Sequence, residues 1–315
     1  MPVAVRRPAL VLLALALVAV GFAGRPADAG TGRIIDFEEA MVDCDTAQLM
    51  GPDQASTDHV TGDPTDVSLD ALVMVDVKEG VSIAAITDPE ERADAEHALF
   101  DGVRSKLTVG TQSYAPLDVD LRYDDFALLQ PLDADGSPRE RTTNAQEIID
   151  LAKLQLGGAR PADIDVVYVV TDIDIQLPGL GNAVAGLADC IGGVAHADRA
   201  FAVGEMGVLI PDEGGIPIGP IAFYKDLTAK IAAHEIGHLM GGHHHYQECG
   251  TAAPAAAQRG EPGPCTLMTN AVDFQTLPFS TLNGAVVRGH AEEYATANDA
   301  PAGTEPPAEH ANHTP

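Results

Sequence analysis

Residues 234–244 read HEIGHLMGGHH, the most informative stretch of this chain. His234 and His238 are four residues apart, so on a helix both imidazoles project from one face, a single turn apart. Two nitrogen ligands at this spacing can hold one small cation, and zinc accepts such ligands in tetrahedral geometry. Glu235 lies beside the first histidine, where a carboxylate can take a proton from a metal-bound water. The spacing therefore predicts a catalytic zinc site on a helix.

The third metal ligand is expected just beyond this helix, because a catalytic zinc site takes three protein ligands and leaves one position to water. Gly241 can adopt the left-handed conformation that ends a helix and turns the chain back, which would bring His244 to the same metal. His243 and His245 are its neighbours, and the spacing favours His244 over both. A non-catalytic zinc-binding cluster is the alternative, and it leaves Glu235 without a role.

The N-terminus has the features of an export signal. Arg6 and Arg7 precede an apolar run over residues 9–23, and residues 27–29, Ala-Asp-Ala, offer a cleavage site between small residues. The apolar run has about fifteen residues, which is fewer than the roughly twenty needed to cross a bilayer as a helix. We therefore expect residues 1–29 to be a signal peptide and the protein to be secreted.

The chain is strongly acidic, with 47 Asp and Glu, 18 Lys and Arg, and a formal net charge of −29. Such a surface repels phosphate backbones and anionic lipid, so we expect neither nucleic-acid binding nor membrane association beyond export. A protein or peptide substrate and a monomeric state are expected. Calcium is possible in so acidic a chain but unsupported, because Asp133 and Asp135 before Gly136 are typical of a surface turn.

The apolar pattern predicts one catalytic domain of the α/β (α+β) class over residues 68–297. Strands that alternate with helices favour a mixed, largely parallel sheet with helices packed on it. Residues 30–67 are interpreted as an N-terminal leader or linker, and residues 298–315 as a disordered tail, since they have little to bury. The expected strands are 69–77, 117–123, 164–171 and 200–205, the expected helices are 88–107, 143–156, 226–241 and 281–295, and Gly-rich loops are expected at 179–193 and 212–219.

The stretch from His234 to His244 resembles the zinc motif of the metzincin clan of endopeptidases, His-Glu-x-x-His-x-x-Gly-x-x-His. The resemblance extends to Met268, 24 residues beyond His244, where metzincins have a methionine in a tight turn beneath the metal. A Phe-Ser pair and a helix follow, an order most like the reprolysin or adamalysin branch. His245 stands where reprolysins have Asp, and no Tyr lies two residues after Met268, so an astacin-like tyrosine switch is not expected.

This resemblance implies a metzincin-like zincin domain. Its parts would be a mixed twisted sheet, the active-site helix at the lower edge of the sheet, and a small irregular C-terminal subdomain. It also implies that residues 200–205 form the edge strand of the cleft and bind the substrate as an added strand.

Four cysteines in an exported chain indicate two disulfide bonds. We favour a pair between Cys249 and Cys265, which would close a short loop before the methionine turn. Two interpretations of the remaining cysteines stay open. Cys44 and Cys190 form a second disulfide that ties the leader to the domain, or Cys44 reaches the zinc as a thiolate and keeps the enzyme latent. The acidic neighbours of Cys44 disfavour the thiolate.

The sequence thus predicts a secreted zinc-dependent endopeptidase in which a zinc-activated water attacks the peptide bond and Glu235 acts as general base and acid. The alternative is a secreted zinc-binding protein without catalytic activity, which would hold one zinc ion and cleave no peptide.

Overall fold

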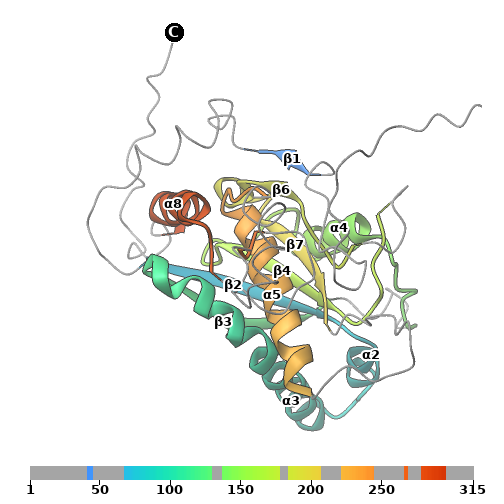
Figure 1. Cartoon of the computed structure of the whole chain (residues 1–315). Coiled ribbons are helices and arrows are strands. Elements are labelled where there is room, and N and C mark those ends of the chain that lie inside the picture. The colour runs from blue at the N-terminus through green and yellow to red at the C-terminus, as the bar shows by residue number, and fades with distance from the viewer. Residues whose placement is uncertain are drawn as a thin grey trace, which may run out of the picture.

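The computed structural model describes residues 41–44, 67–129, 137–177, 184–206, 221–244, 266–268 and 278–295. These residues form a twisted sheet with helices on both faces (Figure 1). No helix in this part of the chain is long and apolar enough to cross a membrane. The predicted signal peptide and C-terminal tail lie outside the described residues, and the predicted domain limits stay predictions.

Five strands form the sheet: β2 (Val67–Asp76), β3 (Val119–Leu128), β4 (Val166–Thr171), β5 (Gly186–Ala188) and β7 (Phe201–Glu205). Their order is β3-β2-β4-β7-β5, and only β5 runs antiparallel to its neighbour. Every residue of β4 is buried, as expected for the continuous apolar run of a central parallel strand covered on both faces. The predicted mixed sheet of an α/β domain is confirmed.

The helices begin where the sequence supplies caps. The Asp88 carboxylate accepts hydrogen bonds from the first N–H groups of α3, and the Asn144 side chain does the same for α4, which satisfies donors that have no partner inside the helix. The helices are α2 (Lys78–Ala84), α3 (Pro89–Leu107), α4 (Ala145–Gln155), α5 (Ile221–Leu239) and α8 (Thr281–His290), which continues into the π-helical η6 (Ala291–Ala295), and the 3₁₀ turns are η3 (Thr108–Ser113), η4 (Ala115–Leu117) and η5 (Gly193–Ala195).

Two hydrophobic clusters cover the two faces of the sheet. On one face, α4 packs over β4 and β7 through Ile148, Ile149 and Ala152. On the other, α5 packs across β4, β7 and β5, with α3 and η3 beside it. Figure 1 shows α5, in orange, lying across the strands, and α3 is the helix packed beside it. The helix predicted to carry the metal site is therefore a core element of the fold.

Two elements correct the predictions for the edge of the sheet. The expected Gly-rich loop at 179–193 contains β5 and the short strand β6 (Cys190–Ile191). The predicted edge strand at 200–205 forms as β7, but it lies inside the sheet, paired with β4 on one side and β5 on the other. Three residues of Gly, Leu and Ala carry no readable strand pattern, so β5 depends on its pairing with β7 and not on local preference.

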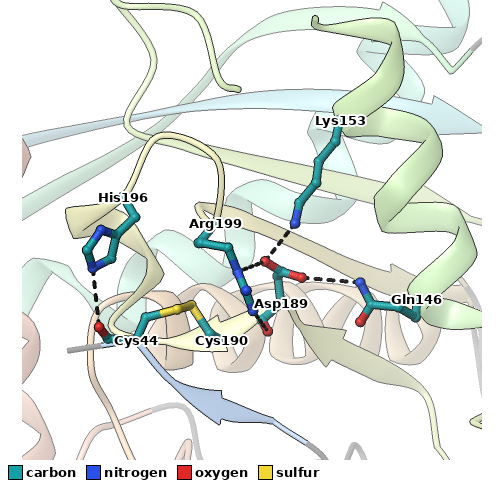
Figure 2. The surroundings of a disulfide bond; sticks show 7 residues. All are labelled: Cys44, Gln146, Lys153, Asp189, Cys190, His196 and Arg199. Carbon is teal, nitrogen blue, oxygen red and sulfur yellow. Dashed lines mark hydrogen bonds and ion pairs between the residues drawn. A yellow bond between two sulfur atoms is a disulfide. The ribbon is translucent and has the colours of Figure 1, made fainter. Parts of the chain in front are cut away.

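Part of the predicted leader is attached to this edge. Strand β1 (Val42–Asp43) pairs in parallel with β6, and a disulfide joins Cys44 to Cys190 (Figure 2). The Cys44 N–H donates to the Ile191 carbonyl at 2.9 Å, and Nε2 of His196 donates to the Cys44 carbonyl at 3.2 Å. Of the two interpretations of Cys44, the structure shows the disulfide and not the latent thiolate. Cys249 and Cys265 lie outside the described residues.

The buried carboxylate of Asp189 links this edge of the sheet to α4. Asp189 lies between β5 and β6, and its side chain accepts hydrogen bonds from Gln146 at 3.2 Å and Lys153 at 2.8 Å and forms an ion pair with Arg199 (Figure 2). Two cations and an amide thus surround this buried carboxylate, so its oxygens have polar partners in place of water. The β5–β6 segment is thus fixed by side chains as well as by its disulfide.

Removing this disulfide should lower stability without removing the catalytic groups. The bond closes a loop across a sequence separation of 146 residues, so its loss frees a large part of the unfolded chain. We expect the double variant Cys44→Ser, Cys190→Ser to lose about 2–4 kcal/mol of unfolding free energy in a urea titration. An unchanged urea midpoint would show that the bond contributes nothing to stability.

Candidate metal centre

The helix α5 carries the zinc motif into the core of the domain. Every residue from Leu227 to Gly242 is buried, which is typical of a helix surrounded on all sides by other elements. The hydroxyl of Tyr114 donates to the Ala233 carbonyl at 2.8 Å, so η3 is fixed to the helix next to the first histidine. α5 begins earlier than the predicted residue 226 but ends, as predicted, at the glycine turn.

That turn has the geometry of a Schellman motif. Gly241 has a φ of +82°, a conformation that a residue with a β-carbon adopts reluctantly. The N–H of Gly241 donates to the His238 carbonyl at 2.9 Å, and the N–H of Gly242 donates to the Gly237 carbonyl at 2.8 Å. The chain therefore reverses directly after the helix, which brings His244 back to the histidine face.

The three predicted ligands meet at their Nε2 atoms. The Nε2 atoms of His234 and His238 are 3.1 Å apart, and that of His244 lies 3.2 Å from each of the other two. His234 and His238 are fully buried, and His244 is half-buried. Among the described residues, these three form the group of side chains that could hold a metal ion.

The other ring nitrogens fix the tautomer of two of the three rings. Nδ1–H of His234 donates to the Leu267 carbonyl at 2.7 Å, and Nδ1–H of His238 donates to the Gly242 carbonyl at 2.7 Å. In a neutral imidazole the second nitrogen is then an acceptor only, so both Nε2 atoms present lone pairs to each other. Lone pairs at this distance repel, and a metal ion that accepts them would remove the repulsion, so the donor set fits a metal ion.

The spacing of the three nitrogens suits zinc. Zinc–nitrogen bonds of 2.0–2.1 Å in tetrahedral geometry separate two nitrogen ligands by about 3.3 Å, close to the distances found here. Backbone acceptors behind metal-binding histidines fix the ring orientation and the tautomer, and both buried rings have one. The residues present therefore fit a tetrahedral metal ion with one position left open.

Met268 lies beneath the end of the helix, fully buried. A β-carbon on Gly237 would lie 2.7 Å from the Met268 sulfur, so the absence of a side chain there lets the methionine approach the last turn of α5. The preceding residue, Leu267, supplies the carbonyl that accepts from His234. The segment predicted to form the methionine turn is thus in contact with the histidine cluster, and no sequence pattern predicted the Leu267 contact.

Glu235 points from α5 toward the edge of the sheet. Its carboxyl group lies against Gly186 of β5, where an added β-carbon would be 2.7 Å from the carboxyl carbon. Burial, and next the negative charge of Glu235, raise the pKa of the Tyr168 hydroxyl well above its ordinary value. Opposite Gly186 in the pairing is Gly204, so two glycines at this point of the sheet give α5 room to approach.

The comparisons with known proteins bear on the same segment. Residues 116–245, from the end of η4 through all three histidines, match the model of the family described as "Metallo-peptidase family M12B Reprolysin-like". Over these residues the chain is similar to reprolysin-like zinc metallopeptidases. The resemblance to the metzincin clan, and to its reprolysin branch, is therefore confirmed, and a metal is implied for the centre of this metallopeptidase.

Solved structures of archaemetzincins are also similar to this reprolysin-like chain. The archaemetzincin of Methanopyrus kandleri has 16% identity and a TM-score of 0.41, over 71% of this chain and 96% of the other. The archaemetzincin of Archaeoglobus fulgidus, complexed with malonate, has 17% identity and a TM-score of 0.35, over 70% of this chain and 99% of the other. A comparison with curated proteins found no match.

Proposed function

We propose that this reprolysin-like chain is a secreted zinc-dependent endopeptidase in which His234, His238 and His244 hold the zinc and Glu235 is the general base and acid. The observation that carries the proposal is the convergence of three Nε2 atoms within 3.2 Å of one another, two from α5 and one from the segment after the glycine turn. Glu235 follows His234 directly on α5. Met268 would support the cluster from below, since it packs against the last turn of the same helix.

A bound zinc ion would supply Lewis acidity, lowering the pKa of a coordinated water and polarising the scissile carbonyl. The protein's own groups do the rest. Glu235 takes the proton of the attacking water and passes it to the leaving amine, so no covalent intermediate is required. The Leu267 and Gly242 carbonyls hold two of the imidazoles in the tautomer that keeps Nε2 available. Because Glu235 and two of the histidines are fully buried, bulk water is excluded around them.

The substrate would bind along β5 and not along β7. Of the strands described, β5 is the outer strand at the β7 end of the sheet. Its outer main-chain groups can therefore pair with an extended peptide. Glu235 lies directly against Gly186 of this strand, so a peptide paired there would pass beside the general base. The Asp189 interactions and the Cys44–Cys190 disulfide keep that strand in place before the substrate arrives.

Secretion and the class of partner rest on the sequence. The N-terminal export signal supports secretion, and a disulfide between Cys44 and Cys190 is compatible with an oxidising compartment. The net charge of −29 disfavours nucleic acid as a partner. We expect the mature chain to act as a monomer on proteins or peptides.

The test of this proposal is metal-dependent peptide cleavage. Purified protein should contain zinc by elemental analysis, and it should cleave members of a broad peptide library at neutral pH. Dialysis against a chelator should abolish cleavage, and added zinc should restore it, because the attacking water needs the metal. Zinc binding without cleavage of any peptide would favour the non-catalytic zinc-binding protein instead.

A further inference from the structure

One side chain outside the zinc motif binds the main chain next to the third histidine. The Oδ1 atom of Asn283, on the first turn of α8, accepts a hydrogen bond from the His243 N–H at 3.1 Å. Its Nδ2 atom donates to the His243 carbonyl at 2.8 Å. Asn283 is 5% exposed, and it satisfies both main-chain polar groups of His243 at once, as a neighbouring strand would.

The position of His243 makes this contact important for the metal centre. His234 and His238 are held by the helix itself and by their Nδ1 hydrogen bonds. His244 lies beyond the glycine turn, where the hydrogen bonds of α5 have ended. Its ring must still place Nε2 within 3.2 Å of the other two rings. A segment without helical hydrogen bonds keeps such a geometry only if other parts of the fold fix its backbone.

Asn283 is itself firmly attached. Its N–H donates to the Ser280 hydroxyl that caps α8, at 3.1 Å. Arg288, farther along α8, donates to the Leu117 carbonyl at 3.0 Å, and this joins α8 to η4. His290, on the same helix, lies against Gly241, where an added β-carbon would meet its imidazole at 2.6 Å. α8 therefore contacts the returning segment at the turn and again at His243.

From these contacts we infer that Asn283 is a positioning residue for the metal centre, acting through the backbone of His243 on the ring of His244. The inference rests on the proposed function, in which the three histidines hold zinc. Asparagine suits this role because its amide offers a donor and an acceptor side by side. Aspartate at neutral pH keeps the acceptor, loses the donor and places a negative charge against the His243 carbonyl. Alanine loses both groups.

The experiment is a zinc titration against a competing chelating dye, on the full mature chain, for Asn283→Asp and Asn283→Ala. We expect both variants to bind zinc about 10- to 100-fold more weakly than the wild type, the range found when partners that orient metal ligands are removed. Asn144→Ala is the matched control. It removes a helix-capping asparagine on α4, away from the centre, so it should lower the thermal midpoint and leave zinc affinity unchanged.

A second comparison separates positioning from general destabilisation. If Asn283 acts through His244, then Asn283→Ala should weaken zinc binding no further in a His244→Ala background, because the ring it places is already absent. Equal losses in both backgrounds would overturn the inference, as would wild-type zinc affinity in both Asn283 variants. Should Asn283→Ala fail to fold by circular dichroism, Asn283→Asp provides the same comparison. A wild-type protein that binds no zinc would instead refute the proposed function.

Discussion

Glu235→Gln should lower kcat by about 10²- to 10⁴-fold, the usual contribution of a general base and acid, while the amount of bound zinc stays unchanged. Glutamine has nearly the shape of glutamate, so it should fill the same buried place against Gly186. It cannot accept the proton of the attacking water. Glu235 does not belong to the group of side chains that could hold the metal ion. Its replacement therefore leaves all three histidine ligands in place.

The measurement is steady-state cleavage of a peptide from the library screen, with zinc determined by elemental analysis on the same sample. We expect the loss in kcat and little change in KM, because the carboxylate acts on the water and not on substrate binding. Cleavage by the glutamine variant at the wild-type rate would exclude Glu235 as the base. Loss of zinc together with activity would show that Glu235 has a structural role at the centre.

His244→Ala should weaken zinc binding by about 10²- to 10³-fold. In structural sites with four protein ligands, apparent zinc affinity is roughly 10–16 kcal/mol, which is about 2.5–4 kcal/mol for each ligand. Cleavage should fall with it at zinc concentrations below the new dissociation constant. The matched control is His243→Ala, one residue earlier. Asn283 binds only the main chain of His243, and alanine keeps both of those groups.

These two variants distinguish between neighbouring histidines that the sequence alone separates only by spacing. A dye competition that measures zinc affinity for both proteins, alongside their cleavage rates, gives the answer directly. A larger loss in His243→Ala than in His244→Ala would mean that the ligand set is wrong. The structure favours His244, whose Nε2 lies 3.2 Å from both of the other histidine nitrogens.

The contacts around this centre come from four separate parts of the chain. α5 supplies two histidines and Glu235, the returning segment supplies His244, residues 267–268 support the cluster from below, and α8 holds the returning segment through Asn283. The three histidines and Glu235 thus lie in one continuous stretch, residues 234–244, whereas the contacts that support them come from other parts of the chain. It also means that variants in α8 can affect metal binding although no α8 side chain belongs to the histidine cluster.

The sequence by itself determined the parts of the site that depend on local geometry. The four-residue spacing of His234 and His238 sets one helical face whatever surrounds it. Gly241 predicted the left-handed turn because few other residues adopt its φ of +82°, and the three-residue step from this turn selected His244. The strands and helices with long apolar runs or clear caps, such as β4 and α3, were predictable for the same reason.

Only the tertiary structure decided which distant segments meet. β5 is too short to show a strand pattern, and its place at the edge, where 200–205 had been expected, follows from pairing with β7. The bond between Cys44 and Cys190, the Leu267 carbonyl behind His234 and the Asn283 contact join residues that are at least 33 positions apart. Such contacts depend on how helices and strands pack around the core, and a spacing rule that spans one or two turns of chain cannot contain that information.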